Sequence, residues 1–544
     1  MDIALEHNHV ALLQHQAKTS GNTVLLKLPV QNGSEPPQTW NNVTVADFYA
    51  DVERVANYLV TELHGKGIPP HSVITLLYDE RLRNQDLAYA IALGRATYIP
   101  QMCTDRLTHP EIIFDLMKKA DSKMILYDPS LEHLTENCPF PKMPFTPIES
   151  IKSTSSADST LPQVEDLASS SDVAFVFLTS GSTSGSPKLV PLTQKVLNFF
   201  YKVRFGRLFE GQSGDAQNAL LARGNICHLP SMIEFLGCVY TKSCLVQPSR
   251  RDYTPEELSR MVNVCGLNHM TTYGTYLSPY IQAAKQDPSI LKLLQEMRTV
   301  SYDGVPITVA DDDWCLENDI PMIDMYAATE MGYVMSTVPG KAGRFVRPLP
   351  GISCRFDPVT DASLQVNPDA PQLVEFVVLS DSPQIAPPHL RSADGNFHTG
   401  DLFEQQPDGS YLYRGRDDDW IKSYDSDRTD AKAIEEKIYD SCRDIVKECA
   451  VVGHLRPSPA LFVAAAREVT FSSEDELREA ILKRLEVFNA RQYVHEAITD
   501  KRLIFVVEEG VLPRTLKGNI RRKAIEQKYS KELDVIFKEV YGDY

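Results

Sequence analysis

Amphipathic helices alternate with short apolar strands from the N-terminal region to about Leu349. Hydrophobic residues recur at helical spacing between Thr44 and Leu63, and Thr44 is suited to cap that helix. The apolar run Val73–Leu77 follows, and a second helical stretch contains Ala88–Leu93. Helices that alternate with buried strands are typical of parallel sheets covered by helices. We therefore expect an α/β fold.

The character of the sequence changes after Gln372, where strands and turns replace helices. Asp394-Gly395 and Asp408-Gly409 are both typical of hairpin turns, and the second has apolar strands on either side. Beyond Arg416 the pattern predicts a smaller α+β unit. Its elements are a helix at Asp430–Cys442, strands at Ala450–Val452 and Ala460–Ala466, a helix at Glu474–Phe488 and a strand at Leu503–Val507.

A length of 544 residues exceeds what one hydrophobic core supports, so at least two domains are expected. We predict a large N-terminal domain, residues 1–416, made of parallel sheets covered by helices plus a β-rich subdomain. A small, mobile α+β domain, residues 417–544, completes the chain.

Charge and cysteine usage narrow the classes of partner. The net charge of -18 argues against nucleic acid and against an anionic membrane as partners. The ten cysteines include no C-x-x-C pair, so neither a zinc site nor a disulfide framework is indicated. No apolar run is long enough to span a membrane, and the N-terminus lacks a signal-peptide pattern. A cytoplasmic location is therefore expected.

A loop rich in Gly, Ser and Thr follows the apolar run Val173–Leu178. Glycines allow close approach of the backbone, while hydroxyl and N–H groups donate hydrogen bonds and the lysine neutralises charge, so the loop suits a phosphate chain. The spacing does not fit a Walker loop, which argues against a P-loop ATPase or kinase. A flexible connector is the alternative. The loop reads Thr179-Ser180-Gly181-Ser182-Thr183-Ser184-Gly185-Ser186-Pro187-Lys188.

Four further blocks follow this loop in the order typical of one superfamily. With them, the chain resembles the adenylate-forming superfamily of acyl-CoA synthetases, luciferases and adenylation domains of non-ribosomal peptide synthetases. The family patterns are T-S-G-S-T-G-x-P-K, Y-G-x-T-E, T-G-D, G-R-x-D-D-x-I-K and P-x-T-x-x-G. Their later counterparts here are Tyr326-Ala327-Ala328-Thr329-Glu330, His398-Thr399-Gly400-Asp401, Gly415–Lys422 and Pro513–Gly518.

The resemblance implies a role for each matched residue. The enzymes join a carboxylate to the α-phosphate of ATP and release pyrophosphate, so the site must supply positive charge and Mg²⁺. The implied roles are phosphate binding by Thr179, Ser180, Gly181, Ser182, Thr183 and Lys188, α-phosphate binding by Thr329, Mg²⁺ ligation by Glu330, adenine contact by Tyr326 and ribose contact by Asp401 and Arg416. For each residue a purely structural role is the alternative.

The C-terminal blocks contain a hinge and a departure from the family pattern. Asp418 matches the hinge at which the small domain pivots between an adenylating pose and a thiol-accepting pose; a solvated acidic turn is the alternative. The family's catalytic lysine directly follows the glycine of the last block, where this chain has Asn519. Lys517, directly before that glycine, is the predicted catalytic cation; a surface lysine is the alternative.

The predicted acid-binding pocket contains Glu234. By alignment it occupies the place of the aspartate that pairs with the substrate's amino group in amino-acid-activating relatives. Because a carboxylate in an apolar pocket is costly unless paired, a cationic substrate is expected: a small amino acid or a betaine-type acid such as glycine betaine. Alternatively, Glu234 caps a helix or meets an arginine. The other pocket residues are Phe235, Cys238, Tyr302, Met325, Tyr333 and Val334, with Tyr273 and Tyr276 as further candidates.

The glycine that usually follows I-K in the family is missing after Ile421-Lys422. In this feature and in the block P-R-T-x-K-G, the chain resembles fungal synthetase-like carboxylic acid reductases, in which adenylation, carrier and reductase domains follow one another. We therefore expect an adenylation domain that passes its acyl group to the phosphopantetheine of a carrier domain in cis or in trans, or else to coenzyme A. The alternatives are a free-standing acyl- or aryl-CoA ligase for a neutral acid, and a degenerate non-catalytic homologue.

Overall fold

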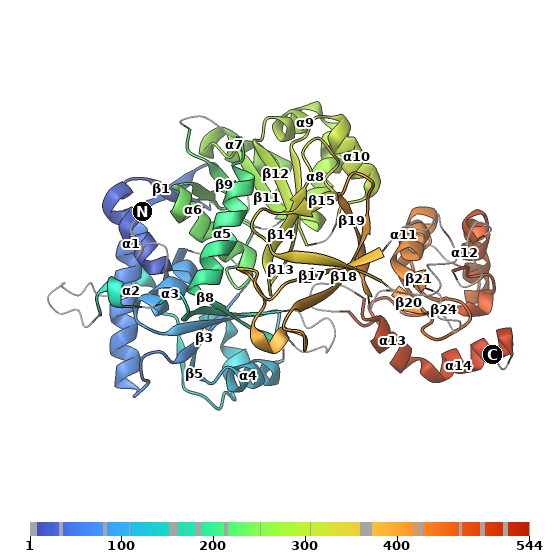
Figure 1. The fold of residues 1–544 in the computed structure, drawn as a ribbon, viewed down its shortest axis with the longest axis horizontal. Helices are drawn as coiled ribbons and strands as arrows, with labels where there is room; N and C mark the ends of the chain where they lie inside the picture. Colours follow the sequence, from blue (N-terminus) through green and yellow to red (C-terminus); the bar gives the residue numbers. More distant parts are fainter. Residues whose placement is uncertain are drawn as a thin grey trace. The chain divides into compact units, whose positions relative to one another are not determined.

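The N-terminal part of the chain is a layered α/β structure, as the alternation of elements predicts (Figure 1). The computed structural model describes residues 8–31, 36–79, 84–107, 109–151, 161–167, 169–179, 187–211, 216–250, 252–304, 306–359, 373–417, 420–422, 428–466, 471–489, 496–514 and 520–542. These residues form two compact units. The first takes its described residues from 1–179, 187–353 and 379–397, and the second from 354–378 and 398–544. The domain boundary at residue 416 stays a prediction.

One sheet of the first unit contains strands in the order β6-β5-β3-β4-β7-β8. Neighbouring strands are parallel except β7 and β8, which form an antiparallel pair. The strands are β3 (Val73–Tyr78), β4 (Ile99–Thr104), β5 (Ser122–Tyr127), β6 (Lys142–Pro144), β7 (Val173–Leu178) and β8 (Leu189–Thr193), and the nearby helices are α2 (Val45–Gly65), α3 (Asn84–Arg95) and α4 (Pro110–Lys119), with 3-10 turns at Pro129–Thr135, Ile148–Ser150 and Val164–Asp166.

The predicted helix start at Thr44 is confirmed, because Thr44 caps α2. The Asp47 N–H donates to the Thr44 hydroxyl at 3.1 Å, and the Thr44 N–H donates to the Asp47 carboxylate at 3.2 Å. This reciprocal pair satisfies backbone donors that the first helical turn leaves unpaired. The buried face of α2 comprises the predicted residues Phe48, Val52, Val55, Leu59 and Leu63.

A second sheet of the first unit has the order β15-β14-β13-β12-β11-β9-β10-β1-β2. Its centre, from β1 through β10, β9, β11 and β12 to β13, is parallel. The strands are β1 (Val24–Pro29), β2 (Trp40–Thr44), β9 (Ala219–Leu221), β10 (Cys244–Val246), β11 (His269–Tyr273), β12 (Thr299–Asp303), β13 (Met322–Ala328), β14 (Gly332–Thr337) and β15 (Phe345–Pro348), and the helices are α1 (His9–Ser20), α5 (Gln194–Leu208), α6 (Leu229–Thr241), α7 (Pro255–Cys265), α8 (Gly274–Gln286), α9 (Pro288–Gln295) and α10 (Val309–Glu317).

The second unit combines a β-rich part with a small α+β part. Its antiparallel strands are β16 (Cys354–Pro358), β17 (Leu373–Val378), β18 (Phe397–Gln405) and β19 (Tyr411–Arg416), followed by β20 (Trp420–Lys422) and β21 (Arg428–Asp430). The α+β part contains α11 (Ala431–Cys442), β22 (Val446–Val452), β23 (Ala460–Ala465), α12 (Glu474–Asn489), a 3-10 turn (Lys501–Leu503), β24 (Ile504–Val506), α13 (Arg522–Lys528) and α14 (Ser530–Tyr541), which agrees closely with the predicted elements.

One of the two predicted hairpin turns joins two strands, and the other does not. Asp408-Gly409 connects β18 to β19, with Gly409 in the left-handed region at φ 77°. Asp394-Gly395 also forms a turn, closed by the Gly395 N–H on the Ser392 carbonyl at 2.9 Å. It leads into β18, however, from a 3-10 turn at Pro388–Leu390 rather than from a strand. A local turn pattern does not determine what precedes the turn.

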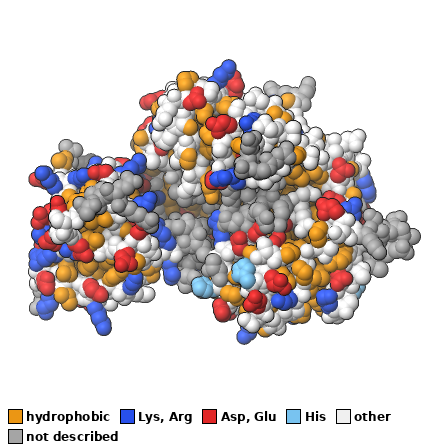
Figure 2. Space-filling model, turned by 180° about the vertical axis from the view of Figure 1, so that it is seen from behind, with side chains coloured by type: hydrophobic (Ala, Val, Ile, Leu, Met, Phe, Trp, Pro, Cys, Tyr) orange, Lys and Arg blue, Asp and Glu red, His pale blue; other side chains and the backbone are white. Residues whose placement is uncertain are grey.

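The described surface carries charges of both signs. On the face drawn in Figure 2, acidic and basic side chains are interspersed. None of the helices in the described ranges is long and apolar enough to cross a lipid bilayer.

Two buried histidines make the stability of the fold sensitive to acid. Burial lowers the pKa of His9 to about 4 and that of His269 to about 3. In the unfolded chain a histidine titrates near pH 6.5. Between these values the unfolded state binds more protons than the native state, so stability falls as the pH falls.

We therefore expect the thermal unfolding midpoint to decrease steadily from pH 6.5 to pH 4. The variant His9→Gln should weaken this dependence, because glutamine does not titrate. Midpoints of the two proteins measured at half-unit intervals test the expectation; parallel curves would contradict it.

Candidate functional site

The predicted phosphate loop connects the two strands of a hairpin. β7 covers the predicted strand residue for residue, and it pairs with β8 so that Leu178 lies opposite Leu189. The Thr179 N–H donates to the Lys188 carbonyl at 3.0 Å, and the Lys188 side chain is exposed. The hairpin thus fixes both ends of the loop. Ser180, Gly181, Ser182 and Thr183 lie outside the described residues.

Three further predicted residues come from the β13–β14 hairpin. Tyr326 lies on β13, and Thr329 and Glu330 form the turn, closed by the Met331 N–H on the Ala328 carbonyl at 3.2 Å. The three predicted side chains are half-buried. Gly332 ends the turn at φ 64°, where a Cβ atom would lie 2.6 Å from the ring of Phe200. The turn is therefore held tightly against α5.

Asp401 and Arg416 lie opposite each other on β18 and β19 of the second unit. Arg416 Nη1 is 3.4 Å from Asp401 Oδ1, and the Tyr413 hydroxyl donates to the same oxygen at 3.4 Å. The Asp401 N–H donates to the Thr399 hydroxyl at 3.0 Å. The structure therefore brings together the two residues for which the sequence predicts a common partner.

Glu234 is buried and ion-paired. It lies on α6 with 1% of its side chain exposed, and both of its partners are arginines with fully buried side chains. Arg204 Nη2 is 3.2 Å and Arg223 Nε is 3.0 Å from Glu234 Oε1. Burial raises the pKa of Glu234, while Arg223 and Arg204 act in the opposite direction. The predicted unpaired Glu234 carboxylate, available to a cationic substrate, is corrected. The structure has the alternative, in which Glu234 pairs with arginine.

Asp303 extends this pair into a cluster of two guanidinium groups and two carboxylates. Arg223 Nη1 lies 2.6 Å from Asp303 Oδ2, and the Tyr333 hydroxyl donates to the same oxygen at 3.1 Å. Although burial lowers it, Asp303 and Glu234 raise the pKa of Arg223 above its ordinary value, so the guanidinium stays charged. We call Arg204, Arg223, Glu234 and Asp303 the buried ionic cluster.

Aromatic rings cover the arginines of the buried ionic cluster. The guanidinium of Arg204 lies 4.5 Å from the ring centre of Tyr333, and that of Arg223 lies 4.9 Å from that of Tyr273. The predicted aromatic cage around a cation thus exists in part, but its cations belong to the protein. Such contacts are favourable for an arginine that has lost its hydration.

The sheet explains why residues so far apart in sequence meet. Arg223 follows β9 after one residue, Tyr273 ends β11 and Asp303 ends β12, and these strands are neighbours and parallel. The carboxyl ends of parallel strands lie at one edge of the sheet, where ligands of α/β proteins commonly bind. Helices α5 and α6 supply Arg204 and Glu234 to the same edge.

Not all predicted pocket residues join the buried ionic cluster. Met325 contacts Arg204, and Cys238 lies one helical turn after Glu234. Phe235 instead packs on Phe48 of α2, with ring centres 5.1 Å apart. Tyr302 belongs to another part of the core.

Tyr302 and Val334 follow the alternation of their strands. Tyr302 lies between Ser301 and Asp303 on β12 and so points to the opposite face of the sheet, where Asp324 and Asp312 contribute to its raised pKa after burial. Val334 follows Tyr333 on β14 and faces away from it in the same way. The remaining candidate, Tyr276, lies 6.4 Å from Tyr273 between ring centres.

Sequence reasoning did not single out Arg204, Arg223 or Asp303. One signal existed for Arg204: it occupies the buried face of α5, in register with Leu197, Tyr201 and Leu208. An arginine on an apolar helix face needs a buried counter-ion. No comparable signal marks Asp303, because a carboxylate before glycine is also typical of an ordinary turn.

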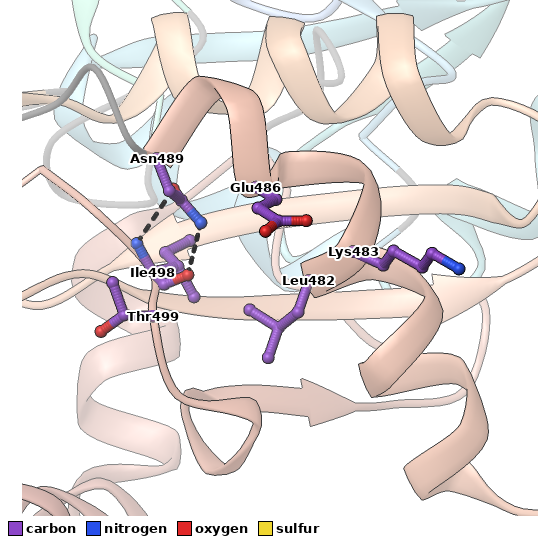
Figure 3. A pocket seen from close by; sticks show the side chains of 6 residues that line it. All are labelled: Leu482, Lys483, Glu486, Asn489, Ile498 and Thr499. Carbon is purple, nitrogen blue, oxygen red and sulfur yellow. Dashed lines mark hydrogen bonds between the residues drawn. The ribbon is translucent and has the colours of Figure 1, made fainter.

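The hinge residue Asp418 and the predicted catalytic Lys517 lie outside the described residues. A hollow of about 330 Å³ does occur in the α+β part of the second unit, lined by Leu482, Lys483, Glu486, Asn489, Ile498 and Thr499. Figure 3 shows that the Asn489 amide bonds both to the carbonyl and to the N–H of Ile498, at 2.6 and 3.3 Å. None of those predicted site residues that the structure describes lines this hollow.

Comparison with known proteins identifies relatives. The chain is 62% identical over 521 residues to the AMP-binding domain-containing enzyme iboA of Amanita muscaria, covering 95% of this chain and all of that protein. It is 24% identical over 329 residues to the adenylate-forming reductase Nps10 of Heterobasidion annosum, covering 57% of this chain but only 29% of the reductase. The crystal structure of ATP-bound MatB from Rhodopseudomonas palustris superposes with a TM-score of 0.72 at 16% identity, covering 96% of this chain and 98% of MatB.

These likenesses confirm the predicted α/β fold class and superfamily. The model of the AMP-binding enzyme family matches residues 13–366, and that of the C-terminal domain of AMP-binding enzymes matches residues 418–541. The chain belongs to the AMP-binding enzyme family.

Proposed function

We propose that the protein activates a carboxylic acid with ATP, forming an acyl-AMP and releasing pyrophosphate, and then passes the acyl group to a thiol. The observation that carries this proposal is the β13–β14 turn, which presents Thr329 and Glu330 side by side and only half-buried. Because these two polar side chains are only half-buried at a tight turn, a ligand can contact them. A turn with a purely structural role would not need a threonine followed by a glutamate. The Asp401–Arg416 pair supports the same assignment.

The reaction joins two anions. A carboxylate oxygen of the acid attacks the α-phosphorus of ATP, and the bond from that phosphorus to the bridging oxygen of pyrophosphate breaks. Thr329 donates a hydrogen bond to the α-phosphate, the loop from Thr179 to Lys188 binds the β- and γ-phosphates, and Lys517 neutralises the approaching charges. Tyr326 lies beside the adenine, while Asp401 and Arg416 hold the ribose.

Glu330 would hold Mg²⁺. Its carboxylate is a hard oxygen donor, and the described residues contain no group of three or more His, Cys, Asp or Glu side chains arranged for a metal. A single carboxylate fits Mg²⁺, which proteins usually bind through one or two carboxylates together with substrate phosphates. When bound, the ion neutralises charge on the phosphates.

The thiol acceptor is either the phosphopantetheine of a carrier domain or coenzyme A, reached after the small domain pivots at Asp418. The reductase-type assignment rests on the likeness to Nps10, of which this chain spans 29%. The chain also matches the whole length of iboA, and a free-standing ligase is the competing hypothesis. Transfer from a supplied acyl-AMP to coenzyme A, compared with transfer to a phosphopantetheine-loaded carrier domain, distinguishes the two.

The substrate hypothesis changes because Glu234 already has partners. A quaternary ammonium group would have to displace two buried guanidinium groups from one carboxylate, so the Glu234 argument for glycine betaine is lost. We propose a small polar acid, because an edge with four charged side chains is unfavourable for a long apolar chain. A neutral aryl or fatty acid is the competing class.

The decisive experiment is ATP–pyrophosphate exchange with a panel of acids: amino acids, glycine betaine, small polar acids, aryl acids and fatty acids. We expect exchange with small polar acids. Exchange confined to aryl or fatty acids would keep the reaction class and exclude the polar substrate. Exchange confined to ammonium-bearing acids would restore the cation hypothesis. No exchange with any acid would favour the non-catalytic homologue.

A further inference from the structure

One segment of the first unit contacts both hairpins that carry predicted phosphate-binding residues. The Gln384 side chain donates from Nε2 to the carbonyl of Tyr333 on β14, at 3.1 Å. Five residues later, Nε2 of His389 lies 3.0 Å from the carbonyl of Leu189, the first residue of β8. Because a carbonyl only accepts hydrogen bonds, this nitrogen carries the hydrogen. We call residues 384–391 the brace.

The brace is stiff between its two contacts. Pro387 and Pro388 lie there, and each proline ring fixes one backbone φ angle. The Leu390 N–H donates to the Pro387 carbonyl at 2.9 Å. Nε of Arg391 donates to the carbonyl of Ala386 at 2.6 Å, and Ala386 is fully buried. The Gln384 and His389 ends are therefore held at a fixed separation.

The His389 contact lies at the base of the predicted phosphate loop. Leu189 directly follows Lys188 and pairs with Leu178 of β7. The Lys188 carbonyl accepts the Thr179 N–H at 3.0 Å. Thr179 and Lys188 are the two predicted phosphate-binding residues of this loop that the structure describes. The brace thus contacts the β7–β8 hairpin at the residue next to Lys188.

The Gln384 contact lies beside the β13–β14 turn. Tyr333, which accepts the bond, directly follows Gly332 at the end of that turn. Helix α5 adds a second contact at the same place, since a Cβ atom at Gly332 would lie 2.6 Å from the Phe200 ring. Strand β8 leads directly into α5. The two hairpins are therefore linked twice, by α5 and by the brace.

The amide of Gln384 is unfavourable for the fold alone. The side chain is fully buried, and its oxygen has no hydrogen-bond partner among the residues that the structure describes. Leaving a buried acceptor unpaired costs more than one hydrogen bond contributes. An apolar side chain of similar length would therefore suit this part of the core better, so the bond to Tyr333 calls for a role beyond stability.

We propose that the brace fixes the β7–β8 and β13–β14 hairpins relative to each other, with Gln384 and His389 as positioning residues for ATP. The inference rests on the proposed function, in which the β7–β8 hairpin binds the β- and γ-phosphates and Thr329 binds the α-phosphate. A ligand that contacts both hairpins binds more tightly when they are already held in place. ATP is such a ligand. AMP, which lacks the β- and γ-phosphates, contacts only the second hairpin.

The test measures the dissociation constants of Mg·ATP and of AMP for the whole chain, by titration calorimetry without an acid substrate, so that no acyl-AMP forms. Gln384→Met and His389→Ala should each raise the constant for Mg·ATP about tenfold, since each frees one end of the brace. The constant for AMP should stay within about twofold, because AMP does not join the two hairpins. His389→Gln should keep tight Mg·ATP binding, since its amide can donate to the Leu189 carbonyl.

The double variant Gln384→Met/His389→Ala tests whether the two residues act through one brace. Residues that act as a unit have non-additive effects, so the double variant should bind Mg·ATP as weakly as each single variant and no more weakly. Multiplied effects, about a hundredfold in the double variant, would show two independent contacts and overturn the inference.

Gln16→Met is the matched control. Gln16 is also a buried glutamine of the first unit whose side-chain oxygen has no partner within the described ranges, but it lies on α1. If Gln384→Met weakens Mg·ATP and AMP equally, or no more than Gln16→Met does, the brace is only structural and the inference is wrong. If Gln384→Met does not fold, His389→Ala, at an exposed position, decides alone: an unchanged constant for Mg·ATP overturns the inference.

Failure of the proposed function gives a different result. Wild-type protein that binds no ATP and shows no exchange with any acid overturns the function and this inference together. If the wild type is active and Lys188→Ala binds Mg·ATP as tightly, the phosphate assignment of the β7–β8 hairpin and the inference are overturned, but adenylation stands. Active wild type, a weakened Lys188→Ala and unaffected brace variants overturn the inference alone.

Discussion

Replacing Lys517 with alanine should reduce acyl-AMP formation by about 100- to 1,000-fold, which is the usual cost of losing one group that stabilises charge in a transition state. The reason is electrostatic. The attacking carboxylate and the α-phosphate are both anions, and their repulsion grows as the site loses water. A cation on a long side chain is the simplest means of offsetting it. ATP–pyrophosphate exchange measures the effect directly.

Two neighbouring substitutions make the Lys517 result specific. Lys523→Ala removes the next lysine along the chain and should leave exchange unchanged. The double variant Lys517→Ala/Asn519→Lys restores a lysine at the position usual for the family, and recovery of exchange would show that either position can deliver the ammonium. Full activity of Lys517→Ala would instead move the role to Lys523 or elsewhere.

Local features of the fold were predictable because they depend on neighbours in sequence. The cap at Thr44 needs only Asp47, three residues later, and β7 is a continuous apolar run with turn residues on both sides. The Asp394-Gly395 turn was predictable as a turn but not as a connection, since the 3-10 turn before it depends on how residues 379–397 pack in the first unit.

The same distinction between local and long-range features applies to the candidate site. The turn that contains Thr329 and Glu330 is local and lies within a short motif, while the roles of these two residues stay predictions. The partners of Glu234 could not be predicted, because Arg204 lies 30 residues away on another helix. Asp303 reaches Arg223 across 80 residues, through the pairing of parallel strands. The order of the strands in the sheet determines which charged side chains form pairs, and no single sequence motif predicts that order.

Replacing Arg223 with methionine should destabilise the first unit by about 3–5 kcal/mol, the usual cost of leaving a buried charge without its partner. Arg223 contacts both carboxylates of the buried ionic cluster, so its loss leaves Glu234 with Arg204 alone and Asp303 without an arginine partner. The urea concentration at the unfolding midpoint measures the effect. Arg250→Met, which removes an exposed pair with Asp252, should cause no measurable shift. Equal shifts in the two variants would contradict the prediction.

Replacing Arg204 and Glu234 together distinguishes an effect on the stability of the fold from an effect on the selectivity for the acid substrate. In Arg204→Met/Glu234→Met the pair formed by Arg223 and Asp303 remains, and replacement of a whole buried ion pair by apolar groups is often close to neutral for stability. We therefore expect the urea concentration at the unfolding midpoint of this variant to be close to that of the wild type and far above that of Arg223→Met. If the sheet edge binds the acid, exchange should then shift from polar acids toward apolar ones, because the edge has lost two charges. A double variant that keeps both the midpoint and the acid preference would mean that the cluster serves the fold alone, and that the acid binds elsewhere.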